Sequence, residues 1–293
     1  MTKQSDFPET AHFMICSAPL IQRPEAPPAA ADVKQLKDII RDMSEEEAAR
    51  LLSLLDASVS AIRVPPEGCA VLYSGGLDSS TVAALCARLM PVTLYSVGTA
   101  GSHDILASLA GAGEMKLNLV SVIAGEDEIK SSAEQVAGLL AEVRGWTMNR
   151  QDISIYAPMF HLMSFVKERH VFTGQGADEL FGGYSRYMRM GAEERVIAMG
   201  SDVKSLLSYG IRRDESVALH FGKELHLPFL SPKVVGFASS LSPESKVDGK
   251  TRKKVLRECA SLLNLKASSA EKKAMQYGSG FDRVLRHAHQ SVL

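Results

Sequence analysis

Short apolar runs alternate with helical patterns along the chain as far as residue 187. The apolar runs, each typical of a buried strand, are residues 70–73, 92–97, 117–123 and 170–173. Between them, apolar positions recur at helical spacing in residues 81–89, 126–144 and 157–168. Because strands that alternate with helices usually form a parallel sheet covered on both faces, we predict an α/β fold with a doubly wound, mostly parallel sheet.

Beyond residue 187 the strand pattern fades and helical spacing dominates. The segments with this spacing are residues 192–210, 214–222, 232–240, 250–263 and 281–288. We therefore predict that the C-terminal part of the chain is mainly helical.

The N-terminal region has a different character. Residues 1–31 are rich in Pro and Ala and predict an extended arm. Residues 32–66 predict a helical segment, with a capping box at Ser44–Glu47 and a stop at Pro65–Pro66. Residues 67–293 then form the main predicted domain, whose strand and helix core extends to about residue 187.

Composition and charge narrow the classes of protein. The chain has 293 residues, of which 45% are hydrophobic and 23% charged, so it can bury a core and is no disulfide-stapled miniature. Its net charge of −1 argues against a general nucleic-acid or membrane-surface binder. Residues 1–180 carry −9 and residues 181–293 carry +8, and this basic C-terminal part suits a small anionic ligand.

Cysteine, histidine and hydropathy patterns exclude further classes. Four cysteines without C-x-x-C spacing argue against a zinc ribbon or iron–sulfur cluster, and eight histidines show no metal-ligand spacing. Neither a signal peptide nor an apolar run of membrane-spanning length is visible. We expect a cytoplasmic protein with reduced thiols and no membrane partner.

A glycine-rich loop, Ser74-Gly-Gly-Leu-Asp-Ser-Ser80, lies between a predicted strand and a predicted helix. Its glycines allow close approach of an anion, and a helix start offers N–H donors with the favourable end of the helix dipole. The spacing fits neither a kinase-type phosphate loop nor a dinucleotide fold. A carboxylate beside a bound polyphosphate requires a bridging cation, so Asp78 predicts Mg²⁺. The structural alternative is a turn that merely caps a helix.

A second acidic motif, Thr173-Gly-Gln-Gly-Ala-Asp-Glu-Leu-Phe-Gly-Gly-Tyr184, follows the last predicted strand. Ligand sites in parallel sheets gather at such strand ends. Asp178 supplies a second carboxylate that could share the metal with Asp78. The alternative is again a helix cap formed by Asp178 and Glu179.

These two motifs resemble a known family. The loop at 74–80 is similar to the pyrophosphate loop of the N-type ATP pyrophosphatases (PP-loop enzymes). The motif at 174–184 resembles the G-E-G-A-D-E-L-F-G-G-Y signature of the synthetase domain of asparagine synthetases and β-lactam synthetases. Weaker matches are Ser96–Gly98, Pro158–Phe160, Glu224–Leu230 and the lysine and glycine segment Glu271–Gly280, so the resemblance covers about 68–282.

The resemblance implies an adenine nucleotide alpha-hydrolase-like fold and an ATP-dependent carbon–nitrogen ligase of amino-acid (asparagine) biosynthesis. Such an enzyme adenylates a carboxylate, releases AMP and pyrophosphate, and transfers the acyl group to ammonia or an amine; aspartate is the leading acid. The implied metal ligands are Asp78 and Asp178, and the implied catalytic residues are Lys272, Glu179 and Gln175. The implied ATP and pyrophosphate site comprises Leu72, Ser74, Gly75, Gly76, Asp78, Ser79, Ser80, Val97, Gly174, Lys254 and Lys272. For Lys272 and Lys273, the alternative is a solvated surface pair.

Three departures from the family pattern bear on the reaction. Residue 2 is Thr, where asparagine synthetases have a nucleophilic Cys, so we expect no glutaminase domain in this chain. Nitrogen would then come from free ammonia, an amine or a separate glutaminase subunit. Gln175 stands where the family has a Glu that accepts a proton, and an amide cannot act as a base near neutral pH. Ser231 stands where family members usually have Asp.

Two alternative functions remain open at the level of sequence. A PP-loop tRNA-modifying enzyme would use the same adenylation chemistry, although the chain lacks a Cys pair and aromatic residues interleaved with basic ones. A nucleotide-binding homologue without ligase activity is favoured by Gln175 and opposed by Asp78, Asp178 and Lys272. The sequence decides neither the acid substrate nor whether the chain forms a homo-oligomer.

Overall fold

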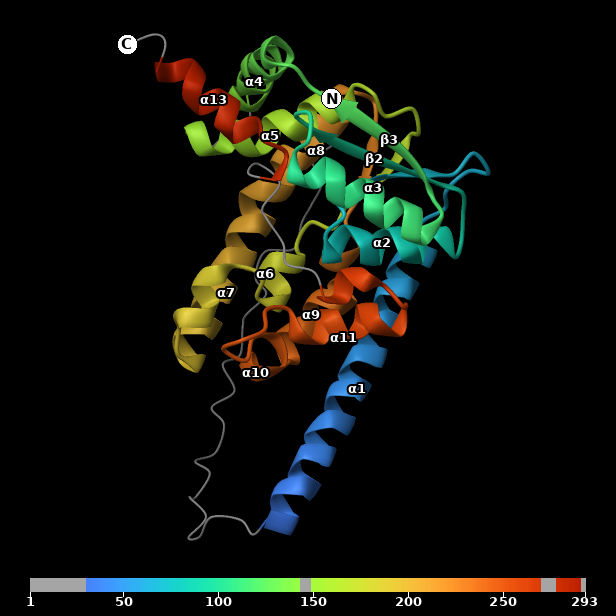
Figure 1. Ribbon diagram of the computed structural model, residues 1–293, viewed down its shortest axis with the longest axis vertical. Coiled ribbons are helices and arrows are strands. Elements are labelled where there is room, and N and C mark those ends of the chain that lie inside the picture. The colour runs from blue at the N-terminus through green and yellow to red at the C-terminus, as the bar shows by residue number, and fades with distance from the viewer. Residues whose placement is uncertain (1–29, 143–148, 270–277, 291–293) are drawn as a thin grey trace, which may run out of the picture. The chain divides into compact units, whose positions relative to one another are not determined.

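The computed structural model describes residues 30–142, 149–269 and 278–290. Its centre is a five-stranded sheet in the order β3-β2-β1-β4-β5, and every neighbouring pair of strands is parallel (Figure 1). The strands are β1 (Cys69–Leu72), β2 (Val92–Gly98), β3 (Asn118–Ile123), β4 (His170–Phe172) and β5 (Glu224–His226). The predicted doubly wound parallel fold is confirmed.

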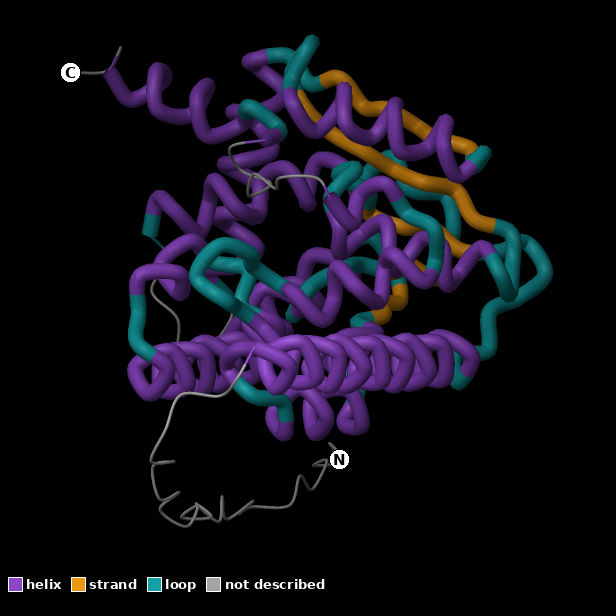
Figure 2. Tube along the Cα trace, turned by 60° about the horizontal axis from the view of Figure 1, so that its bottom comes forward, coloured by secondary structure: helices purple, strands orange, loops and turns teal. Residues whose placement is uncertain are grey.

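Helices connect the strands and cover both faces of the sheet, as Figure 2 shows with helices in purple and strands in orange. Up to β4 they are α1 (Ala30–Ser60), α2 (Leu77–Ala87), α3 (His103–Met115), α4 (Glu126–Ala141) and α5 (Arg150–Met163). Alternate residues of β1 point to opposite faces: Cys69 and Val71 pack with α2, whereas Ala70 packs with α4 and α5. All three side chains are buried.

The remainder is mainly helical, as predicted. Between β4 and β5 lie α6 (Ala177–Phe181), η1 (Ser185–Arg189), α7 (Ala192–Ser205), η2 (Leu206–Gly210) and α8 (Ile211–His220). After β5 come η3 (Pro228–Leu230), α9 (Pro232–Ser240), α10 (Pro243–Lys246), α11 (Lys254–Leu262), η4 (Lys266–Ser269) and α13 (Phe281–Gln290). The helices α9 and α11 share a core with α2, whereas α8 and α13 pack with α4 and α5.

The η2 segment is a π-helical turn that joins α7 to α8 without an intervening loop. A π turn accommodates one residue more than an α-helical turn and is often found at functional sites. Leu206 and Gly210, at its two ends, are buried.

Besides several helical turns of three to five residues, the prediction omitted α3 and β5. The α3 segment contains Gly111 and Gly113 and exposes Leu106 and Leu109, so its apolar residues do not form one buried stripe. The β5 strand has three residues, two of them Glu224 and His226, which is too short and too polar to display strand periodicity. It nevertheless pairs with β4 and extends the sheet by one edge strand.

By its internal packing the chain divides into two units, residues 1–41 and 42–293. Within the second unit, the later turns of α1 contribute Ala48, Leu51, Leu55 and Val59 to the core that also contains β1 and α2. This part of the predicted helical segment is therefore integral to the α/β core. None of the helices in the described ranges has the length and hydropathy needed to cross a membrane.

Candidate functional site

A cavity of about 480 Å³ opens at the carboxyl ends of β1, β2 and β4. Its walls come from the loops that follow these strands and from α5, η2 and α8. Nine residues predicted from the sequence line it, namely Leu72, Ser74, Asp78, Ser79, Val97, Gly174, Gln175, Asp178 and Glu179. The structure thus brings both predicted motifs to one cavity.

The glycine-rich loop makes a tight turn between β1 and α2. Gly75 has φ +72°, and a Cβ at this position would lie 2.4 Å from the carbonyl carbon of Ala107, so only glycine fits. Gly76 precedes α2 and makes no side-chain cap, while the Ser74 N–H donates to Ser79 Oγ over 3.3 Å. A helix start of this kind, preceded by a glycine turn, is suited to binding phosphate.

The two predicted metal carboxylates face each other across a lysine. Lys253 Nζ lies 2.6 Å from Asp78 Oδ1 and 2.6 Å from Asp178 Oδ1. The Asp78 and Lys253 side chains are only 6% and 5% exposed, whereas Asp178 is 24% exposed toward the cavity that it lines. One ammonium therefore neutralises part of the charge of two acids that would otherwise repel each other.

Local backbone geometry makes this arrangement possible. At Gly183 a Cβ would lie 1.7 Å from Asp178 Oδ1 and 2.3 Å from Lys253 Cε, so a side chain there would displace both charged groups. Lys253 itself has φ +56° and immediately precedes α11. The lysine is therefore held by the start of a helix whose Val255 and Leu256 are buried in the core.

Some predicted residues lie elsewhere. Gly75, Gly76 and Ser80 belong to the loop and the first turn of α2, and the buried Ser80 hydroxyl lies 3.2 Å from the Tyr73 hydroxyl. Lys254 is half-buried on α11 and does not line the cavity, since its neighbour Lys253 takes the position between the carboxylates. Lys272 lies outside the described residues.

A further part of the cavity lining consists of Gln175 and of residues of α5 and α8 that were not predicted. Asp214 is 5% exposed and accepts hydrogen bonds from the Gln175 amide and the Tyr156 hydroxyl. Its second oxygen, Oδ2, is buried and makes no hydrogen bond within the described residues. Burial raises the pKa of Asp214 to about 7, against the lowering effect of the neighbouring Arg213 guanidinium.

Arg213 is anchored next to this carboxyl group. Its Nη1 donates to Asp152 Oδ1 over 2.9 Å, and both side chains are 10% exposed. The guanidinium lies 5.1 Å from the centroid of the Tyr156 ring. These residues come from helical faces that carry ordinary amphipathic patterns, so only the burial of charged residues in the structure marks them as part of a site.

Glu179 lies near Asp178, one of the two predicted metal carboxylates, but has a different environment. It is 8% exposed, and the Tyr184 hydroxyl donates to its Oε1 over 2.5 Å. Burial raises the pKa of Glu179, while the bond from Tyr184 acts in the opposite direction. The tyrosine thus fixes the carboxyl group in place.

Part of the cavity lining is apolar. It consists of Leu72 and Val97, at the ends of β1 and β2, and of Met159 and Leu162 of α5. Such side chains suit the flat face of an adenine ring, whereas the charged lining residues suit phosphate and metal.

Comparison with known families gives one clear match. The sequence matches the family called asparagine synthase over residues 50–200 and 190–292. A protein of Methanocaldococcus jannaschii named as a glutamine-hydrolysing asparagine synthetase is 31% identical over 255 residues, which cover 73% of this chain and 46% of that protein. The glutamine-hydrolysing asparagine synthetase of Gallus gallus is 28% identical over 75% of this chain and 38% of its own length.

The chain thus spans less than half the length of these two curated relatives. Among solved structures, an NMN synthetase from Francisella tularensis aligns with a TM-score of 0.41 and 13% identity, over 84% of this chain and 86% of its own. An NH₃-dependent NAD synthetase from Campylobacter jejuni aligns with a TM-score of 0.32 and 14% identity, over 67% and 91% of the two chains.

Proposed function

This chain belongs to the asparagine synthase family, and from that premise we propose that it is an ATP-dependent amide-forming ligase. In the proposed reaction it adenylates a carboxylate, releases pyrophosphate and transfers the acyl group to ammonia or an amine. Aspartate is the leading acid, because relatives named as asparagine synthetases match most of this chain.

One observation carries the proposal: Asp78 and Asp178 meet Lys253 at the glycine-rich loop, and both acids line the same cavity as Gln175 and Asp214. A triphosphate at the loop and an acid beside Gln175 would then lie in one cavity. Bringing both reactants together removes much of the entropic cost of a reaction between two molecules.

The two carboxylates fit a magnesium ion. Both Oδ1 atoms lie 2.6 Å from the same Nζ and hence less than about 5.2 Å apart, and Mg²⁺ favours carboxylate and phosphate oxygens as ligands. Asp78 and Asp178 would hold the ion, which would neutralise charge on the phosphates. Lys253 would then contact phosphate oxygens, alongside Lys272, to which the family resemblance assigns the same role.

The proposed reaction has two steps. An oxygen of the acid attacks the α-phosphorus of ATP, and the bond to the β-phosphate oxygen breaks, so that pyrophosphate leaves. The loop and the start of α2 would stabilise the charge that develops on this leaving group. The amine nitrogen then attacks the acyl carbon and AMP leaves. Splitting one difficult substitution into two easier ones is the advantage of the adenylate.

The second step releases a proton from the attacking nitrogen. Gln175 cannot take it, since its amide is not basic near neutral pH. Asp214 is the neighbouring carboxyl group, and its pKa of about 7 means that an appreciable fraction is ionised at neutral pH. We infer that Asp214 accepts this proton and that Gln175 orients the attacking nitrogen through its carbonyl oxygen.

The decisive experiment is pyrophosphate exchange into ATP, measured with Mg²⁺ and a panel of acids that includes aspartate. Exchange that depends on one acid is the expected result. The Asp178→Asn variant should lose at least about a hundredfold in exchange rate. It removes one proposed ligand of the ion that would neutralise the charge on the departing pyrophosphate. Exposed Asp127 on α4 supplies the matched control, Asp127→Asn, which should retain the wild-type rate.

Amide formation is measured separately, as AMP and product released with ammonium ions or with an amine. ATP binding without exchange or AMP release for every acid tested would overturn the ligase proposal and favour a nucleotide-binding homologue. Acid-independent binding of tRNA, with a strong dependence on salt, would instead favour the tRNA-modifying alternative.

A further inference from the structure

A cluster of two histidines and one glutamate lies on β4 and the edge strand β5, outside the cavity of the candidate ATP site. His170 begins β4, and Glu224 and His226 lie at the two ends of β5. In the register of these parallel strands His170 is paired with Glu224, and Phe172 with His226, so the three side chains share one face of the sheet. The glycine-rich loop, in contrast, follows the carboxyl end of β1.

The potential ligand atoms converge. His170 Nδ1 lies 2.9 Å from His226 Nε2 and 3.4 Å from Glu224 Oε2, and one ligand atom from each residue lies within 4.8 Å of the others. Around a tetrahedral zinc ion with bonds near 2.1 Å, neighbouring ligand atoms are about 3.4 Å apart. The pairs that involve His170 are thus close to this spacing, and since the third pair lies within 4.8 Å, side-chain shifts of at most about 1.4 Å would admit the ion.

The surroundings orient two of these ligands. Glu224 Oε1 accepts a hydrogen bond from Arg169, which leaves Oε2 directed toward His170. The His170 and His226 rings are stacked, with centroids 5.2 Å apart and an angle of 13° between their planes. Such contacts to a partner group or a neighbouring ring hold a metal ligand in one orientation.

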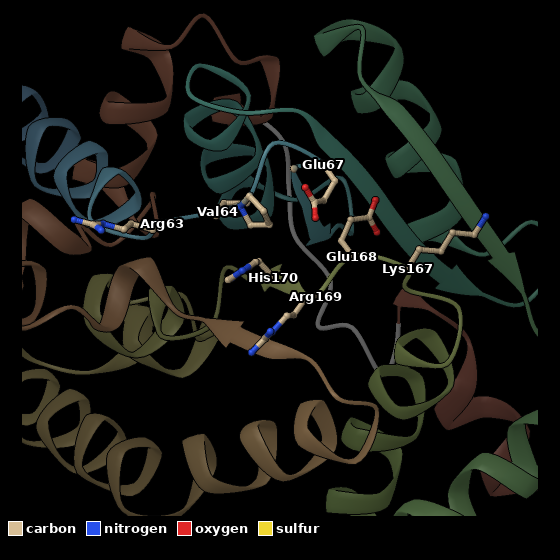
Figure 3. A pocket seen from close by; sticks show the side chains of 9 residues that line it. Arg63, Val64, Glu67, Lys167, Glu168, Arg169 and His170 are labelled. Carbon is tan, nitrogen blue, oxygen red and sulfur yellow. The ribbon is translucent and has the colours of Figure 1, made fainter.

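A second cavity, of about 820 Å³, reaches His170 from the solvent. Its walls are the segments that precede β1 and β4, with Arg63, Val64 and Glu67 on one and Lys167, Glu168 and Arg169 on the other. Figure 3 shows His170 between Val64 and Arg169 in this cavity. His170 is the one residue of the cluster that lines this cavity.

From this geometry we propose that His170, Glu224 and His226 form a binding site for Zn²⁺ or a similar late first-row divalent ion. Two imidazoles and one carboxylate are a donor set that favours zinc over Mg²⁺, which prefers oxygen ligands alone. A water molecule would complete the four-coordinate shell. The three described cysteines, Cys69, Cys86 and Cys259, are buried in the core that contains β1, α2 and α11 and do not belong to this cluster.

This site is separate from the proposed ligase site, and its failure would leave the ligase proposal untouched. None of its three residues lines the cavity that contains Asp78 and Asp178. The ion would join the edge strand β5 to β4 through side chains as well as through the backbone.

The test is a titration of the metal-free chain of 293 residues with Co²⁺, in excess Mg²⁺ so that oxygen-ligand sites are already occupied. We expect one equivalent of Co²⁺ to produce the visible absorption of a four-coordinate site and Zn²⁺ to abolish it by displacement. The His226→Gln and Glu224→Gln variants should each weaken binding by at least about tenfold. These two side chains are partly exposed, so their replacement should preserve the fold.

The matched controls are His287→Gln, which alters an exposed histidine on α13, and Asp178→Asn, which alters the other candidate metal site. Both should bind Co²⁺ as the wild type does. Absence of stoichiometric binding to the wild type, or equal affinity in the His226→Gln variant when circular dichroism shows native structure, would overturn the proposal. Loss of binding in Asp178→Asn would assign the ion to the ATP site and overturn it as well.

Discussion

At the scale of single residues, the raised pKa of Asp214 can be tested through the pH dependence of stability. Aspartate in an unfolded chain has a pKa near 3.9, whereas burial raises the pKa of Asp214 in the folded protein to about 7. The folded state therefore binds this proton more tightly than the unfolded state does. The resulting stabilisation is complete below the unfolded pKa and is lost as the pH rises through 7.

The Asp214→Asn variant has no proton to lose at this position. We therefore expect the free energy of unfolding to fall between pH 5 and pH 8 by about 2–3 kcal/mol more in the wild type than in the variant. Urea unfolding at both pH values measures this difference. An equal pH dependence of the two proteins would show that Asp214 titrates normally.

Lys253 and Lys254 form a natural pair for comparison. Removing the ammonium from between the buried Asp78 and the half-buried Asp178 leaves their charges uncompensated, and the loss of one partner of a buried ion pair typically costs about 3–5 kcal/mol. We expect Lys253→Gln to lower the unfolding midpoint and pyrophosphate exchange, and Lys254→Gln to change either by little. Lys253→Arg, which keeps the charge, should recover part of the stability. Equal effects of the two glutamine variants would contradict the role assigned to Lys253.

Lys253 and Lys254 also show which site residues can be predicted from the sequence and which cannot. The sequence points to Asp78 and Asp178 because each lies in a glycine-containing loop that follows a predicted strand. At such a position, metal binding and helix capping are the two roles that the sequence analysis considers for a carboxylate. Two adjacent lysines, in contrast, offer no periodic signal that selects one of them. The choice depends on the φ of +56° at Lys253, which turns one side chain toward the acids. Asp214 was missed because nothing in a helical pattern reveals a buried charge.

At the scale of elements, the π turn η2 makes a specific prediction. Deleting exposed Leu207 would convert it into an ordinary α-helical turn and leave α8 in its present rotation. Deleting exposed Glu215 within α8 would rotate the following residues by about 100° and turn buried Val217 and Ala218 out of the core.

We therefore expect the Leu207 deletion to retain a cooperative unfolding transition and the Glu215 deletion to lose several kcal/mol of stability. Thermal unfolding followed by circular dichroism compares the two. Since Leu206 and Gly210 line the cavity, the Leu207 deletion should also raise the KM for the acid. Comparable loss of stability in both deletions would show that η2 is not a local insertion.

Helices and strands were predicted correctly where their packing requires a simple pattern of apolar positions in the sequence. Strands β1 and β2 are buried on both faces, so they appear as continuous apolar runs that no amphipathic helix would show. Edge strand β5 shows no such apolar run, because two of its three residues, Glu224 and His226, are polar. Helix α3 exposes several leucines, which hides its periodicity.

At the scale of the whole molecule, the position of the N-terminal boundary can be tested by truncation. Leu51, Leu55 and Val59 are fully buried in the core of the second unit, and burial of each such side chain contributes about 1.5–3 kcal/mol. A chain of residues 42–293 should therefore keep its cooperative unfolding, and a chain of residues 62–293 should lose it. Urea titration of both distinguishes the outcomes; folding of the shorter chain would show that the helix is dispensable.

The contact of Lys253 with Asp78 and Asp178 has a consequence for the order in which the molecule folds. The lysine is separated from Asp78 by 175 positions in the sequence, so the contact closes a very long loop. Until α11 docks, the Lys253 ammonium is not available to the glycine-rich loop. The Asp78 and Asp178 carboxylates then avoid mutual repulsion by lying apart, by binding protons or by remaining hydrated. During synthesis on the ribosome, the strands of the sheet emerge well before this residue. The nucleotide pocket should therefore mature late, and affinity for ATP would report that the last helices have docked.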